Sequence, residues 1–198
     1  MIVCTFSKST SFIAANPFHS SWIDIIFILL TSLGDGLFAL FLVLLFIFLK
    51  RKDIALKLVF TFLLSGGVAQ LLKAWFHAPR PKLFFSPQTY THFIDGVTNS
   101  GMNSFPSGHA TTAFAIACIL ACNIACKKWC SLFFILAALI VYSRIYLGQH
   151  FIEDTLAGII IGMFSSIITE LLYLHLTIYH SRKIRIPVHD RKPLTIEL

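Results

Sequence analysis

Long apolar stretches without a charged residue limit what the chain can fold into more than any other feature. Examples are Leu37–Leu49, Leu58–Val68 and Leu132–Val141. Only 13% of the 198 residues are charged and 57% are hydrophobic, whereas about a quarter of a soluble domain is charged. A soluble protein of this size could not bury so much apolar surface. The sequence therefore predicts an all-α, polytopic membrane helical bundle.

The apolar pattern and its interruptions predict about six transmembrane helices. The expected helices are Trp22–Leu33, Leu37–Leu49, Ile54–Phe76, Gly108–Ala125, Trp129–Tyr146 and Phe151–Tyr173. The first is short for a full span, so a tilted span and a partly interfacial helix are both open for it. Asp35 is expected to break or cap a helix between the first two, with lining of the functional site as the less favoured alternative. Residues 78–105 are expected to form a loop rich in proline and glycine. Gly66 and Gly67 lie in the third helix, where we expect them to let another helix approach closely.

The positions of lysine and arginine predict how the bundle is oriented, because cytoplasmic loops of membrane proteins are enriched in these residues. With six spans, both termini are expected in the cytoplasm of a multi-pass plasma (inner) membrane protein, the first span serving as the insertion signal. The twelve basic residues then on the cytoplasmic side are Lys8, Lys50, Arg51, Lys52, Lys57, Lys127, Lys128, Arg182, Lys183, Arg185, Arg191 and Lys192. The four on the extracytoplasmic side are Lys73, Arg80, Lys82 and Arg144. We expect one membrane-embedded domain, 1–198, with a core at about 20–175 and a basic cytoplasmic tail at 181–198.

The net charge of +7 would suggest a nucleic-acid partner in a soluble protein. In this chain no basic stripe is interleaved with exposed aromatic residues, so we expect no nucleic-acid binding.

Four of the five cysteines recur every four residues, at Cys118, Cys122, Cys126 and Cys130. This spacing on one helix face favours small packing residues over metal ligands.

Charged and imidazole side chains are costly at membrane depth, so each one in this chain is a candidate functional residue. Three clusters of them are expected at the extracytoplasmic face. The first contains Lys73, Arg80 and Pro81, the second contains Pro106, Ser107, Gly108 and His109, and the third contains Ser143, Arg144, His150 and Asp154. Six further histidines, His19, His77, His92, His175, His180 and His189, match no motif and stay unassigned.

The residue types in the three clusters predict an anion site. Lys73, Arg80 and Arg144 supply positive charge and hydrogen-bond donors that suit phosphate oxygens. Ser107 and Gly108 lead directly into a helix, whose first backbone N–H groups and dipole favour an anion. The site is therefore expected to bind a phosphate group.

Two histidines and one carboxylate add the groups needed for covalent chemistry. His150 and Asp154 are four residues apart at the expected start of a helix, and hence on one face. The carboxylate can hold one imidazole nitrogen protonated and leave the other free to attack. His109 has no carboxylate at helical spacing, so it remains as the general acid for the leaving oxygen.

Together the three clusters resemble the signature of the type 2 phosphatidic acid phosphatase family. These lipid phosphate phosphatases share their site with the vanadium haloperoxidases. The signature reads Lys-x6-Arg-Pro, Pro-Ser-Gly-His and Ser-Arg-x5-His-x3-Asp, and every fixed position is matched here. The resemblance, which covers about residues 20–175, implies a membrane enzyme that removes phosphate from a lipid.

The resemblance also implies a role for each residue. His150 becomes a phosphohistidine, Asp154 supports it, and His109 protonates the leaving group. The residues implied to hold the phosphoryl oxygens are Lys73, Arg80, Ser107, Gly108 and Arg144. No metal or other cofactor is implied, and the partners are the bilayer and a lipid phosphate.

Two other functions fit parts of this pattern. A halide-oxidising enzyme with bound vanadate would use the same residues, but such enzymes are larger and soluble. A non-catalytic carrier or scaffold would not require His109, His150 and Asp154 together. For a phosphatase, phosphatidic acid, phosphatidylglycerol phosphate, a polyprenyl diphosphate and a lipid A phosphate are all open as substrates.

Overall fold

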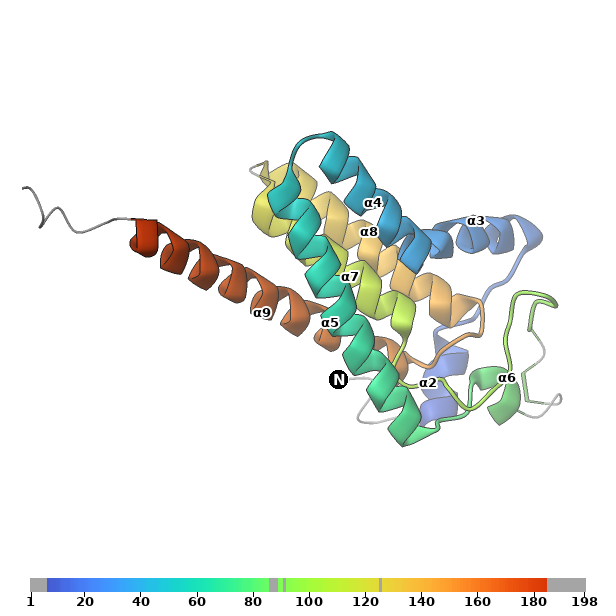
Figure 1. Ribbon diagram of the computed structural model, residues 1–198. Helices are drawn as coiled ribbons and strands as arrows, with labels where there is room; N and C mark the ends of the chain where they lie inside the picture. Colours follow the sequence, from blue (N-terminus) through green and yellow to red (C-terminus); the bar gives the residue numbers. More distant parts are fainter. Residues whose placement is uncertain (1–6, 86–88, 91, 125, 185–198) are drawn as a thin grey trace, which may run out of the picture.

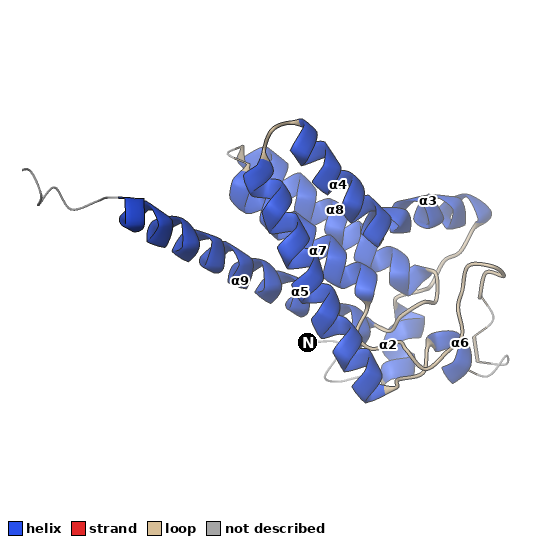
Figure 2. Cartoon of the chain, viewed as in Figure 1, coloured by secondary structure: helices blue, strands red, loops and turns tan. Residues whose placement is uncertain are grey.

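The computed structural model describes residues 7–85, 89–90, 92–124 and 126–184 (Figure 1). Within these residues every regular element is helical, which confirms the expected all-α fold (Figure 2). The elements are α2 (Lys8–Ala14), α3 (Ser21–Thr31), the 3-10 turn η1 (Ser32–Gly34), α4 (Gly36–Phe48), α5 (Lys52–Phe76), α6 (Pro81–Phe84), α7 (Gly108–Asn123), α8 (Lys127–Tyr146) and α9 (Ile152–Ile184). Two short helices, α2 and α6, were not expected, and α9 continues past Tyr173. Most of the expected basic tail, 185–198, lies outside the described residues.

Helix α7 is the centre of the bundle and packs against α5, α8 and α9. Small side chains cover much of its surface and are buried, among them Ala110, Ala113, Ala115 and Ala117. Such residues let neighbouring backbones approach closely, as is typical of helices that associate in membranes. The N-terminus of α7 is thereby surrounded by the ends of the three neighbouring helices.

The crossing of α9 over α7 depends on two glycines. A Cβ atom added at Gly158 would lie 2.6 Å from the carbonyl oxygen of Ser107. One added at Gly162 would overlap the carbonyl oxygen of Thr111 and lie 2.9 Å from the backbone nitrogen of Ala115. Glycine at these positions therefore sets how close α9, which carries Asp154, comes to the start of α7.

The expectation that Gly66 and Gly67 allow a close helix approach is wrong. Apart from the adjacent backbone of α5 itself, no described atom lies within 4 Å of a Cβ atom added at either residue. Both glycines are on α5, away from the backbones of α7 and α9. The sequence pattern alone does not distinguish glycines that face a neighbouring helix from those that face open space.

Three helical segments are long and apolar enough to cross a membrane: Lys52–Phe84, Lys128–Tyr146 and Ile152–His180. Two further segments, Ser21–Gly34 and Gly36–Phe48, are each too short to cross a membrane alone. Together they are long and apolar enough, but the chain bends by 56° between them. Helix α7, with 16 residues, is apolar but shorter. By length and composition, the described part of the chain therefore contains three or four spans, and the expected count of six is not confirmed.

The segment from α2 to the start of α3 lies at the end of the bundle that carries the sequence motifs (Figure 1). Asn16 Nδ2 donates a hydrogen bond to the carbonyl oxygen of Ile145 over 3.1 Å, and the Tyr146 hydroxyl donates to Asp24 over 2.7 Å. Helix α3 thus runs across this end of the bundle and is not a separate crossing. This does not fit the expected arrangement, in which the N-terminal segment and the motifs lie on opposite faces.

Replacing Gly162 with alanine is expected to destabilise the protein by about 1–3 kcal/mol, because the added methyl group forces α7 and α9 apart. The melting temperature of the detergent-solubilised chain should fall accordingly. Gly67→Ala is the matched control, since the methyl group enters open space and alanine is the better helix former. Equal losses in the two variants would contradict the close contact between α7 and α9.

Candidate active site

The structure brings the three sequence motifs together at one end of the bundle. Lys73 is in the last turn of α5, Arg80 precedes α6, Ser107 caps α7, Arg144 is in the last turn of α8 and Asp154 is in the first turn of α9. The Ser107 N–H donates a hydrogen bond to the Asp154 carbonyl oxygen over 2.9 Å. The second and third motifs are therefore joined directly through the backbone.

Two buried arginines form the positive part of the site. Arg80 is 8% exposed and Arg144 is 7% exposed. Arg80 donates to Asn103 over 2.8 Å and to Gln149 over 2.5 Å, while Arg144 donates to Thr31 over 2.7 Å. Within the described residues, Arg144 Nε has no hydrogen-bond partner and neither guanidinium group pairs with a carboxylate. Buried charge without a counter-ion is costly, so an anion bound between these groups would lower the free energy of the site.

Lys73 and the start of α7 complete the anion site. The Lys73 ammonium nitrogen lies 3.9 Å from the position that a Cβ of Gly108 would occupy. The positive charges of Arg80 and Arg144 repel the Lys73 ammonium group. The Ser107 hydroxyl accepts from the backbone N–H of Ala110 over 3.4 Å and so caps the helix. The first N–H groups of a helix have no partner within it, so they and the ammonium group can serve the same anion.

His109 is packed against the turn that precedes α4. A Cβ atom added at Gly34 would lie 3.2 Å from the His109 Cβ and 2.7 Å from Ile140 Cγ2. Only glycine lets η1 approach this closely. Through this contact the bent pair of α3 and α4 forms one wall beside the imidazole ring.

His150 and Asp154 are both buried, but they do not share a direct hydrogen bond. His150 Nδ1 is 3.8 Å from Asp154 Oδ2, which is beyond hydrogen-bonding distance. The Ser104 hydroxyl lies between them, donating to Asp154 Oδ2 over 2.5 Å and lying 3.5 Å from His150 Nδ1. Ser104 therefore connects the carboxylate with the imidazole.

The expected helical relation between His150 and Asp154 is wrong, because α9 begins at Ile152. His150 lies in the turn before α9, where its N–H donates to the carbonyl oxygen of Arg144 over 3.2 Å. The Asp154 carboxylate accepts from the Phe151 N–H over 3.0 Å and so caps α9. The turn and this cap, not helical spacing, bring the two side chains together.

Burial lowers the pKa of His150 to about 4, even though Asp154 opposes the shift. At neutral pH the imidazole is therefore uncharged and has a nitrogen lone pair. Nδ1 faces Ser104 and Asp154, so Nε2 is the ring nitrogen whose lone pair can act as a nucleophile.

The remaining motif residues have packing roles. Ser143 is buried and its hydroxyl donates to the carbonyl oxygen of Ile140 over 2.6 Å. Pro81 is buried as the first residue of α6, and Pro106 is buried next to the cap of α7. These residues shape the backbone that holds the charged groups.

Several polar residues of the site carry no signal in the sequence. They are Lys8, Thr31, Asn103, Ser104 and Gln149. Lys8 Nζ lies 3.9 Å from Asp154 Oδ1, an oxygen to which no described residue donates a hydrogen bond. The sequence could have suggested three of them only through their position next to a motif. Asn103 and Ser104 precede the second motif, and Gln149 lies within the third.

A cleft of about 280 Å³ reaches the site between α4, α5 and α7. Its lining includes Lys73 and His109, together with Asp35, Gln70 and Gly66. The open space beside Gly66 is thus part of this cleft. Asp35 accepts from the Gly36 N–H over 2.8 Å, which confirms its expected role as a helix cap.

A helical membrane fold with two buried arginines beside a buried, neutral histidine agrees with the predicted class, a membrane phosphatase. The chain belongs to the PAP2 superfamily, whose family model matches residues 54–177. It is 29% identical over 174 residues to a lipid A 4'-phosphatase of Porphyromonas gingivalis, covering 83% of this chain and 72% of that protein.

Two crystal structures have a similar fold. LpxE of Aquifex aeolicus matches with a TM-score of 0.71 at 30% identity, covering 85% of this chain and 98% of that chain. A PAP2-type phosphatidylglycerolphosphate phosphatase of Bacillus subtilis matches with a TM-score of 0.67 at 23% identity, covering 93% and 87% respectively. The family and these relatives confirm the predicted class, a membrane lipid phosphate phosphatase.

Replacing Ser104 with alanine is expected to lower kcat for phosphate release about tenfold, with KM little changed. The change removes the shortest hydrogen bond to Asp154, worth about 1–1.5 kcal/mol, and the link to His150. Steady-state kinetics on the purified protein measure this effect. Ser100→Ala, an exposed position in the same loop, is the control, and equal rates for the two variants would contradict the role of Ser104.

Proposed function

We propose that the protein hydrolyses a phosphomonoester or diphosphate of a membrane lipid at the extracytoplasmic face, through a phosphohistidine at His150. The observation that carries the proposal is the buried, neutral imidazole of His150 beside Arg80 and Arg144, two buried arginines that no described carboxylate neutralises. A phosphoryl group bound there supplies the missing negative charge and lies next to the nucleophile.

In the first step His150 Nε2 forms a bond to phosphorus while the bond from phosphorus to the lipid oxygen breaks. His109 donates a proton to the departing oxygen. A bound phosphoryl dianion favours the protonated form of His109 before this step. Asp154 and Ser104 stabilise the positive charge that develops on His150.

In the second step a water molecule attacks the phosphohistidine. His109, now neutral, accepts a proton from the water, and the bond from phosphorus to nitrogen breaks. Inorganic phosphate leaves, and His150 returns to its neutral form. Lys73, Arg80, Arg144 and the start of α7 stabilise the charge on the phosphoryl oxygens in both steps, so no metal ion is needed for the chemistry.

The leaving lipid is proposed to occupy the cleft between α4, α5 and α7, because this cleft reaches both His109 and Lys73. A lipid A phosphate is the first candidate substrate, given the similarity to the Porphyromonas gingivalis enzyme. Release of inorganic phosphate from lipid A, phosphatidylglycerol phosphate, undecaprenyl diphosphate and phosphatidic acid in detergent identifies the substrate. Release from none of them would contradict the proposed function.

Two alanine variants test the division of labour between the histidines. His150→Ala is expected to abolish release of phosphate from every substrate, because no covalent intermediate can form. His109→Ala should slow formation of the phosphoenzyme about 10²–10⁴-fold with a lipid phosphate, whose alkoxide is a poor leaving group. The same step should slow far less with nitrophenyl phosphate, as the initial burst of nitrophenolate measures.

The control for this pair is His180→Ala, an exposed position on α9 that should leave both activities unchanged. The roles are reversed if His150→Ala retains activity on nitrophenyl phosphate while His109→Ala forms no phosphoenzyme.

The distribution of basic residues supports an extracytoplasmic site even though residues 8–24 lie on the site face. Lys8 then joins Lys73, Arg80, Lys82 and Arg144 on that side. The opposite side still carries Lys50, Arg51, Lys52, Lys57 and Lys128, and the C-terminal end of α9 lies on that side. We therefore revise the proposed topology, with the segment around α2 extracytoplasmic and the end of α9 cytoplasmic.

Single cysteines in a background without native cysteines test this topology in intact cells. Ala14→Cys and Asn99→Cys, both exposed on the site face, should react with a membrane-impermeant thiol reagent. Lys128→Cys, exposed on the opposite face, should react only after the membrane is permeabilised. Labelling of Lys128→Cys but not Asn99→Cys would place the site in the cytoplasm.

A further inference from the structure

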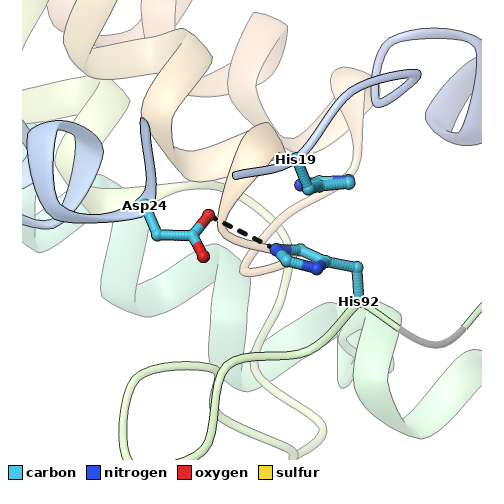
Figure 3. Close-up of side chains that lie close together, drawn as sticks. All are labelled: His19, Asp24 and His92. Carbon is cyan, nitrogen blue, oxygen red and sulfur yellow. Dashed lines mark hydrogen bonds and ion pairs between the residues drawn. The ribbon is translucent and has the colours of Figure 1, made fainter. Parts of the chain in front are cut away.

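A second cluster of imidazole and carboxylate groups lies near the phosphate site, and the proposed reaction does not use it. His19 precedes α3, Asp24 is in the first turn of α3, and His92 is in the loop between α6 and α7 (Figure 3). One potential ligand atom from each of the three residues lies within 4.8 Å of the other two. The two histidines are far apart in the sequence, and only the fold brings them together.

We propose that His19, Asp24 and His92 bind a divalent transition metal ion, with zinc as the best match. Two imidazoles and one carboxylate are a donor set that zinc takes with a fourth position left for water. Imidazole ligands also suit nickel and copper, whereas magnesium and calcium prefer oxygen ligands. The proposed site is separate from the groups that bind phosphate.

The spacing of the ligand atoms is close to that of a zinc site. Ligands bound to tetrahedral zinc at about 2.0–2.1 Å lie roughly 3.4 Å from one another. His92 Nε2 is already 3.4 Å from Asp24 Oδ1. The rings of His19 and His92 are stacked, with centroids 3.6 Å apart. Binding therefore requires the His19 ring to turn so that its lone pair faces the ion.

An unsatisfied nitrogen of His19 points to a ligand. His19 Nδ1 is buried, and no described residue forms a hydrogen bond with it. Its other ring nitrogen, Nε2, lies 3.2 Å from the Tyr90 hydroxyl. Buried polar atoms without hydrogen-bond partners are rare. A bond from this nitrogen to a metal ion would satisfy it.

The two tyrosines around the cluster would orient its ligands. Tyr90 holds His19 through Nε2, and the Tyr146 hydroxyl donates to Asp24 Oδ1 over 2.7 Å. Histidines that bind metals almost always form a hydrogen bond through the second ring nitrogen, and ligating carboxylates are also hydrogen-bonded. The side chains of His92 and Asp24 are 32% and 17% exposed, which gives an ion a path to the site.

A bound ion would fix the loop that forms one side of the phosphate site. The loop after His92 contacts the turn before His150, because the Thr98 hydroxyl donates to the carbonyl oxygen of Leu147 over 2.9 Å. Phe93 packs against Gly148, where an added Cβ would lie 2.9 Å from the ring. The ion would thus link α3, this loop and the end of α8, stabilising the site without taking part in the reaction.

Metal binding is measured on the full chain, purified in detergent with a tag that contains no histidine. After treatment with chelator and dialysis against zinc, elemental analysis should find about one zinc ion per chain, and the melting temperature should rise with zinc concentration. Magnesium should not compete. The metal-free protein should still release phosphate at low temperature, because the catalytic groups need no metal.

Variants assign the binding to this cluster. His92→Ala and Asp24→Asn should lose the bound zinc and the rise in melting temperature, whereas His175→Ala, an exposed histidine of α9, should keep both. Tyr90→Phe should bind zinc about 10–100-fold more weakly, as expected for loss of a group that orients a ligand.

Retention of zinc by the His92→Ala variant would overturn the proposal. So would a wild-type protein that binds no zinc while it releases phosphate normally, in which case the cluster is a hydrogen-bonded contact only. That second result leaves the proposed phosphatase reaction intact, so the two proposals fail separately.

Discussion

Two guanidinium groups lie buried at one end of this bundle, and the free energy of keeping them there shapes the site around them. Each is held by neutral groups: Asn103 and Gln149 bind Arg80, and Thr31 binds Arg144. Neutral partners position a guanidinium group but do not balance its charge. Removing such an ion from water costs several kcal/mol of folding free energy. In the proposed reaction, a phosphoryl anion removes that cost on binding. The bundle is thus prepared for a ligand that it must also release, which suits an enzyme better than a scaffold.

The packing of the helices places the reacting groups relative to this charge. Gly158 and Gly162 bring α9 against α7, so that the Asp154 carbonyl oxygen accepts from the Ser107 N–H. The close approach of Gly34 to His109 brings the bent pair of α3 and α4 to the other side. The cluster of His19, Asp24 and His92 then ties the loop between α6 and α7 to the same end (Figure 3). Backbone contacts between small residues therefore determine the geometry of the phosphate site.

Much of the site follows from the sequence, because its charged residues are unusual in an apolar chain and their spacing matches one family. Apolar runs likewise predict most helix boundaries to within two residues. What the sequence does not reveal depends on long-range contacts. Ser104 acts through Asp154, fifty residues later in the chain, and nothing local marks it. Helix α3 is as apolar as a spanning helix, yet its polar contacts at Asp24 hold it across the end of the bundle. Gly66 faces open space beside α5, which the sequence pattern cannot show.

The central claim is that His150 carries the phosphoryl group, and trapping the intermediate tests it most directly. The His109→Ala variant is mixed with a radiolabelled activated phosphomonoester. The reaction is stopped under alkaline conditions, which preserve the acid-labile phosphohistidine, and the labelled peptide is mapped. This variant lacks the base for the second step, so label should accumulate on the peptide that contains His150 and be absent when His150 is also replaced. Label on another residue, or label that persists in the double variant, would contradict the account.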